Sequence, residues 1–184
     1  MTIIDTIKDE HVRLSSRLAL LRREIDIWTR NGEPDYDLLY LLAQYFMKFP
    51  DEIHHKKEDR IYDALIEDGV LETEYLLRLK SEHEQIGLLA GQFSEHFDDL
   101  LAHHASPKWA MIDKVKKFVA MQELHMADEE SQFLPLAQKE LSEKRLTEIN
   151  EAVQNELITD AARESFRLLA GIDAEIDSHI AKKG

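Results

Sequence analysis

Apolar side chains recur every three or four residues along most of the 184-residue chain, and this period is the strongest constraint on its fold. Such spacing puts the apolar residues on one face of an α-helix. With only six glycines and four prolines, the chain has few residues for the many turns of an all-β fold. We therefore expect an all-α protein. The first apolar stripe has one gap, which His11 fills, and consists of Ile4, Ile7, Leu14, Leu18, Leu21, Ile25 and Trp28.

Turn-forming pairs divide this pattern into four long helices. Asn31-Gly32 ends the first, Asp68-Gly69 ends the second, and Ser106-Pro107 begins the fourth. The second helix contains Pro50, which should kink or restart it because proline removes an intrahelical hydrogen bond. Four long helices with short connections predict an antiparallel up-down-up-down four-helix bundle over residues 1–140.

The last part of the chain, residues 141–184, has two weaker amphipathic stretches. They predict a helical C-terminal extension that packs on the bundle or lies at an oligomer contact, such as that of a homodimer.

Charge and composition exclude several classes of function. Lys and Arg number 23 against 37 Asp and Glu, a net charge of −14, so we expect no nucleic-acid partner and no membrane partner. The absence of cysteine excludes disulfides, thiolate metal sites and cysteine catalysis. The start of the chain lacks an apolar signal-peptide segment, and no apolar run approaches the ~18 residues of a transmembrane helix. A cytoplasmic protein is the default expectation.

Four of the nine histidines stand on apolar stripes, one on each predicted helix. A glutamate follows two of them at i+4, so each pair shares a helical face. At ~1.5 Å rise per residue, counting from the connecting turns puts all four histidines in nearly one layer. A buried glutamate is costly unless it is paired or coordinates a metal. The constellation is His11, His54, Glu58, His83, His125 and Glu129.

Four histidines and two glutamates are too many ligands for one ordinary divalent ion, but they suit two ions bridged by the carboxylates. Imidazole and carboxylate without thiolate favour iron among the redox metals, with manganese or zinc as substitutes. The order, histidine before glutamate, differs from the Glu-x-x-His motif of ferritin-like proteins, and a zinc-protease His-Glu-x-x-His is absent. A lone histidine on an apolar stripe is more often a core residue than a ligand.

The segments around these residues resemble a known family over about residues 1–140. They are Asp9-Glu10-His11, His54-His55-Lys56-Lys57-Glu58-Asp59, Ser81-Glu82-His83, and His125-Met126-Ala127-Asp128-Glu129-Glu130 with Phe133-Leu134-Pro135-Leu136. The chain is similar to the hemerythrin-like (His-His-Glu cation-binding) domains. The resemblance implies a non-haem di-iron centre in an antiparallel four-helix bundle. It also implies four terminal ligands, His11, His54, His83 and His125, and two bridging carboxylates, Glu58 and Glu129.

One departure from the family pattern concerns the third helix. Oxygen-carrying members have a second histidine four residues after the first, and here that position is Gly87. Either one iron is left more open or another residue substitutes. His55 is the best substitute, although it lies ~100° around the helix from His54. An open position would favour exchange and redox turnover over reversible O2 carriage.

The other polar residues receive simpler interpretations. Asp9, Glu10 and Glu82 neighbour ligand histidines and are candidates to hydrogen-bond the ligands. Tyr62 is interpreted as core packing rather than as lining a pocket. We expect a solvated position for the remaining candidates, His96, His103, His104, His179, Lys56, Lys57 and Arg60.

Three functions compete. The first is a di-iron protein that binds O2, NO or a peroxide, or reacts with it, in sensing, scavenging or oxidation. Both a binding role and a redox-enzyme role fit such a site. The second is iron storage or buffering, or repair of other iron centres under oxidative or nitrosative stress. The third is a purely structural bundle, which a charge-transfer band on iron reconstitution would exclude.

Overall fold

The computed structural model describes residues 2–101, 108–157 and 159–183, and every regular element in them is a helix. This confirms the all-α class. Two short turns, η1 and η2, are π-helical. The elements are α1 (Ile3–Thr29), α2 (Tyr36–Phe49), η1 (Pro50–His54), α3 (His55–Glu67), α4 (Thr73–Leu101), α5 (Lys108–Asp128), η2 (Glu129–Phe133), α6 (Leu134–Glu140), α7 (Glu143–Leu157) and α8 (Asp160–Lys183).

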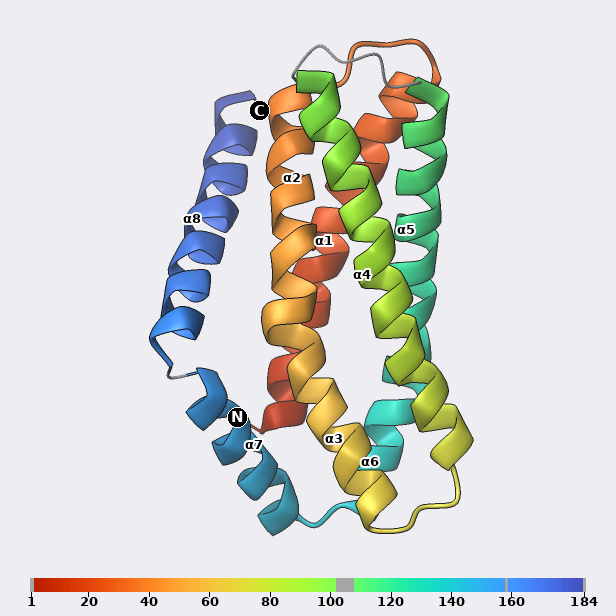
Figure 1. Cartoon of the computed structure of the whole chain (residues 1–184), viewed down its shortest axis with the longest axis vertical. Coiled ribbons are helices and arrows are strands. Elements are labelled where there is room, and N and C mark those ends of the chain that lie inside the picture. Colours follow the sequence, from red (N-terminus) through yellow and green to blue (C-terminus); the bar gives the residue numbers. More distant parts are fainter. Residues whose placement is uncertain (1, 102–107, 158, 184) are drawn as a thin grey trace.

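The long helices form a bundle (Figure 1). Helix α1 packs against α2 and α5, and α4 packs against α2, α3 and α5, so the contacts close a ring. Helices α7 and α8 lie along one side, where α7 contacts α3 and α1, and α8 contacts α2. None of the helices in the described ranges is long and apolar enough to cross a membrane.

Local signals fix several helix ends. Thr2 and Asp5 form a reciprocal capping box at the start of α1. Asn31 (φ 60°) and Gly69 (φ 80°) have left-handed backbone conformations just after α1 and α3, as the two turn predictions require. The Ser106-Pro107 start and the pair His103-His104 lie outside the described residues.

The helix that contains Pro50 continues through it, so the expected kink or restart takes another form. A π-helical turn begins at Pro50, and the His55 N–H donates to the Pro50 carbonyl five residues earlier. Such a turn takes in one residue more than an α turn, which rotates the following residues back by roughly 100°. The inward stripe of α3 therefore stays aligned with that of α2. A second turn of this kind, η2, carries a Leu134 N–H bond to the Glu129 carbonyl.

The apolar core is divided into two clusters. One joins α2 and α8 to parts of α1, α4 and α5, and includes Leu18, Phe46 and Phe118. The other joins α3, α6 and α7 to the first turns of α1 and α4, and includes Ile7 and Phe133. Along α1, His11 falls between the two clusters. The predicted polar layer is thus enclosed by apolar side chains at both ends.

The C-terminal extension is anchored to the bundle by burial and by ion pairs. Ile176 is fully buried in the larger core cluster. Buried Arg17 of α1 donates to Asp173 at 2.9 and 2.7 Å and to Asp177 at 2.7 Å. His179 lies 2.6 Å from the carboxylate of Asp35.

Lys57 and His179, which we expected to be solvated, pair with carboxylates elsewhere in the chain. His179 forms the ion pair just described, whereas His96 is half-buried and its Nδ1–H donates to the Gln92 carbonyl of its own helix at 2.7 Å. Lys57 is buried, and its ammonium donates to Glu10 at 2.8 Å and to the Ile53 carbonyl at 3.1 Å. The carboxylate compensates the buried charge, and residue type alone did not reveal this partner.

Candidate metal centre

The six residues predicted from spacing converge on one point inside the bundle. Each comes from a different element: α1, η1, α3, α4, α5 and η2. Glu129 begins the π-helical turn η2. All are buried, and the most exposed, His83, shows 6% of its surface. The six are His11, His54, Glu58, His83, His125 and Glu129. Their role as ligands stays a prediction, but the structure brings all of them together.

Glu58 lies between histidines of different helices. Its Oε1 is 3.2 Å from Nε2 of His11 and 3.2 Å from Nε2 of His54. Its Oε2 is 3.5 Å from Nε2 of His83 on the other side of the bundle. One carboxylate therefore faces two separate groups of imidazoles, one with each oxygen.

Glu129 repeats this arrangement from the opposite wall. Its Oε2 is 3.4 Å from Nε2 of His11, while its Oε1 is 3.2 Å from Nε2 of His125 and 3.7 Å from that of His83. The hydroxyl of fully buried Tyr62 donates to the same Oε1. Tyr62 was interpreted as core packing, and it does pack on Phe133, yet it also contacts the site directly.

His55 belongs to the same cluster. It is 3% exposed, and its ring stacks on that of His83 with centroids 3.9 Å apart. His54, by contrast, meets the ring of His11 at 4.9 Å. The ~100° between consecutive residues thus sends His54 toward α1 and His55 toward α4. Because of this angle, the two neighbouring histidines contact different partners.

The donor atoms fall into two sets, each close enough to hold one ion. His11, His54 and Glu58 form one set, and the other is formed by His55, Glu58, His83 and His125; within each set the ligand atoms lie within 4.8 Å of one another. Glu58 is common to both. Nε2 of four of these histidines has no hydrogen-bond partner, nor have Glu58 Oε2 and Glu129 Oε2. Buried and convergent ligand atoms that lack hydrogen bonds fit a bound metal.

A carboxylate holds the far nitrogen of every one of the five histidines at 2.9 to 3.1 Å. An Nδ1–H that donates to a carboxylate fixes the tautomer, so that the Nε2 lone pair faces the metal. Glu10 and Glu82 act in this way, as predicted, whereas Asp9 is exposed. The pairs are His11–Glu130, His54–Glu10, His55–Asp51, His83–Asp59 and His125–Glu82.

Four of these carboxylates follow a rule that the sequence analysis missed. Each stands next to a cluster residue in sequence and contacts the histidine of a neighbouring helix, so the support passes once around the bundle. Asp51 is the exception, because it lies four residues before His55 on the same helix. The acids at positions 10, 59, 82 and 130, each adjacent to a predicted ligand, were the available signal.

The electrostatics of the cluster depend on these pairings. Burial lowers the pKa of His11, but contacts with Glu129 and Glu58 outweigh it and raise the pKa to about 10. The pKa of His83 is likewise raised to about 10, because Asp59 and Glu129 outweigh burial. Burial and the neighbouring His83 lower the pKa of His55 to about 4. Without a metal, imidazolium charges balance the two buried carboxylates.

Fold and site together define the class of protein: a helical bundle that encloses a buried histidine and carboxylate centre suited to metal. A family model, the hemerythrin HHE cation-binding domain, matches residues 2–137. The chain belongs to this family, as the sequence motifs indicated. Searches of curated proteins and of solved structures found no match to the chain.

Proposed function

We propose that the protein holds a non-haem di-iron centre that binds O2, NO or a peroxide, or reacts with it, in sensing, scavenging or oxidation. One observation carries the proposal. Each of the two buried carboxylates, Glu58 and Glu129, has one oxygen beside one histidine set and the other oxygen beside the second set. That is the arrangement of carboxylates that bridge two ions.

Five imidazoles and two carboxylates favour iron, with manganese or zinc as substitutes. His11 and His54 would hold one ion and His55, His83 and His125 the other, so His55 takes the role for which Gly87 provides no side chain. Bound iron would supply the electrons for redox chemistry.

The chain's own residues would orient and isolate the site. The outer carboxylates keep each Nε2 directed at the metal position. Tyr62 donates to Glu129 and holds one bridging oxygen in place. The two apolar clusters exclude bulk water from both ends of the layer, which strengthens every electrostatic interaction within it.

We further propose that residues 1–140 form the functional unit, an antiparallel up-down-up-down four-helix bundle. The closed ring of helix contacts supports this, as do the α1–α2 and α3–α4 connections at opposite ends (Figure 1). Residues 141–184 form the extension, and Leu169 and Ile176 are buried in the bundle's core cluster. This burial supports packing within one chain, and a homodimer through the extension stays a prediction.

Anaerobic iron reconstitution followed by metal analysis and absorption spectroscopy tests the centre. The expected result is two irons per chain with a charge-transfer band. His54→Ala and His55→Ala should each lose one iron, from different sets, and His96→Ala, outside the cluster, serves as the control. Full iron content in both His54→Ala and His55→Ala, or in both His54→Ala and a further variant, His125→Ala, would contradict the ligand assignment.

Exposure of the loaded protein to NO and H2O2 separates the proposed function from its alternative. A centre that handles these molecules changes its spectrum rapidly while the iron stays bound to the protein. Storage, buffering or repair instead predicts that iron passes to a chelator or to an apo iron protein on a similar timescale. Passage of iron without a prior spectral change would favour the alternative.

A further inference from the structure

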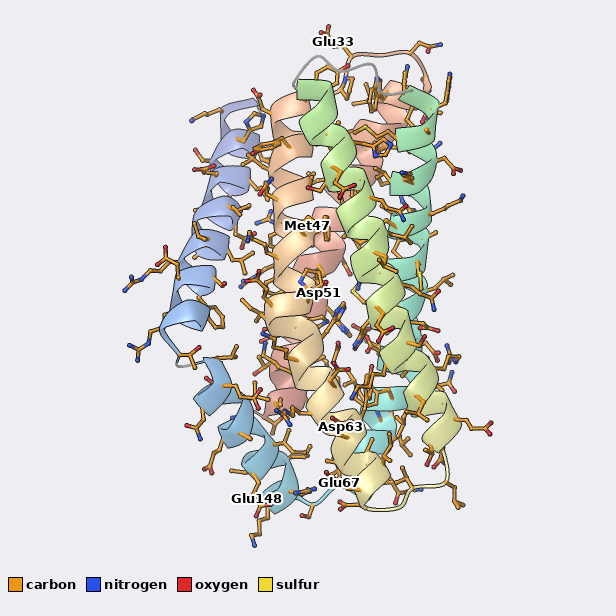
Figure 2. The ribbon with its side chains drawn as sticks, in the orientation of Figure 1. Glu33, Met47, Asp51, Asp63, Glu67 and Glu148 are labelled. Atoms are coloured by element: carbon orange, nitrogen blue, oxygen red, sulfur yellow. The ribbon has the colours of Figure 1, made fainter. Side chains whose placement is uncertain are left out.

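A groove on the bundle surface leads to the cluster. It lies along α4, η1 and α3, has a volume of about 680 Å³, and includes His55 and His83 among its lining residues. Figure 2 labels Asp51, at its α2–η1 side, and Met47 one turn earlier. Four other surface hollows do not reach the cluster. The described residues that line them include neither His55 nor any of the six predicted ligands.

A missing side chain at position 91 opens the groove on the α4 side. Gly87 and Gly91, one helical turn apart, line it. A Cβ at Gly91 would have Met47 Sδ as its nearest neighbour, at an ordinary contact distance of 3.9 Å. Position 91 therefore has room for a side chain, and its glycine leaves that room to the groove.

The wall of the groove is acidic. Asp51, Asp59, Glu84 and Glu95 line it, and the described lining residues include neither lysine nor arginine. Glu84 and Glu95 are exposed near the groove's outer edge, whereas Asp51 and Asp59 contact His55 and His83. Carboxylates thus extend from solvent to the imidazoles.

The inner end of the groove provides ring nitrogens without hydrogen bonds. Nε2 of His55 and Nε2 of His83 have no hydrogen bond, and the two residues are 3% and 6% exposed. A cation that enters along the carboxylates would therefore reach two ring nitrogens that form no hydrogen bond. The observation is independent of the acidic wall and points to the same kind of ligand.

We propose that this groove is the loading site through which a hydrated divalent cation reaches the buried centre. The proposal rests on the metal centre proposed above and adds its route of access. Carboxylate oxygens bind a hard hydrated cation outside, and the imidazoles replace its water inside. Clefts lined by one sign of charge raise the local concentration of the opposite ion and its rate of association.

The test follows Co²⁺ uptake by the metal-free full chain in a stopped-flow spectrometer. The double variant Glu84→Gln/Glu95→Gln removes two charges at the outer edge, and its matched control Glu151→Gln/Glu164→Gln removes two exposed charges from α7 and α8. Gly91→Leu fills the groove without a change of charge. Its control is Gly171→Leu on α8, where a Cβ has nothing within 4 Å.

The double glutamine variant should load about three- to tenfold more slowly at low ionic strength, the lower end of electrostatic focusing effects. Its rate should also depend less on salt. Gly91→Leu should load more slowly with wild-type salt dependence, and every variant should reach the wild-type cobalt content. Loading of either test variant at the rate of its control would overturn the groove as the route. A wild-type chain that takes up no cobalt would instead overturn the metal centre itself.

Discussion

Replacement of Gly87 by alanine should weaken metal binding without a change to any predicted ligand. A Cβ at position 87 would lie 2.6 Å from Oδ2 of Asp51. To reach an ordinary 3.4 Å contact the carboxylate must retreat by about 0.8 Å. The Asp51 side chain is 48% exposed, so it can move toward solvent. Its 3.0 Å hydrogen bond from the His55 Nδ1–H then lengthens or breaks.

Gly87→Ala should change the metal affinity more than the stability of the metal-free protein. Alanine is better than glycine inside a helix by about 0.5–1 kcal/mol. Loss of a half-exposed contact to Asp51 costs about 0–1 kcal/mol. The free energy of unfolding of the metal-free protein should therefore change by less than about 1 kcal/mol. Loss of a carboxylate behind a ligand histidine typically lowers metal affinity about 10- to 100-fold, which corresponds to about 1.4–2.7 kcal/mol.

Competition with a chromogenic chelator for Zn²⁺ or Co²⁺ measures the affinity, and urea unfolding of the metal-free protein measures the stability. Asp51→Asn should reproduce the loss for one of the two ions, and Gly171→Ala, in open space, should leave both unchanged. Wild-type affinity for both ions in Gly87→Ala and in Asp51→Asn would refute the assignment of His55 as a supported ligand.

Three further outcomes follow from the structure. A free metal concentration one hundred times the Kd of a site stabilises the folded protein by about 2.7 kcal/mol. Removal of the metal should therefore lower the melting temperature, measured by calorimetry, by about 5–10 °C for each such site. Ile176→Ala should lower the urea-measured unfolding free energy by about 2–5 kcal/mol, and a loss below about 0.5 kcal/mol would show that α8 does not pack on the bundle in solution. Tyr62→Phe, which removes the hydroxyl that donates to Glu129, should destabilise the metal-free protein by about 1–3 kcal/mol in the same assay; an unchanged value would contradict this bond.

The convergence of the six predicted residues was accessible from sequence because helix geometry is rigid. A period of 3.6 residues decides which face a side chain occupies, and a rise of 1.5 Å decides its depth. These two numbers were enough to place two pairs of residues in the layer, His54 with Glu58 and His125 with Glu129. The family motifs pointed to the same residues, and the family match confirms that resemblance.

The position of His55 was not accessible in the same way. A single sequence gives the angle between His54 and His55 but not which neighbouring helix lies in each direction. That depends on how α3 packs between α1 and α4. The π-helical turn at Pro50 could not be predicted for a related reason. It aligns the inward faces of α2 and α3, and that alignment depends on tertiary packing. Lys57 was misassigned because its partner Glu10 is on another helix.

The outer carboxylates show an intermediate case. Glu10 and Glu82 were found because they neighbour histidines, while Asp59 and Glu130 neighbour the glutamates and were missed. The outer carboxylates are found by searching beside every residue of the buried polar layer, glutamates included, rather than beside the histidines alone. An acid next to any residue of a buried polar layer can reach across to the adjacent helix.

The ring of histidine–carboxylate pairs also bears on the order in which the protein folds. Four of the pairs each join two different helical elements: α1 to η1, α3 to α4, α4 to α5, and η2 back to α1. A partly docked bundle would leave at least one pair unmade and one side of the cluster open to water. We predict that the complete layer forms only after the last helix has docked, beyond the folding transition state. Interactions absent from that transition state act on the unfolding rate. Bound metal should therefore slow unfolding while the refolding rate stays almost unchanged.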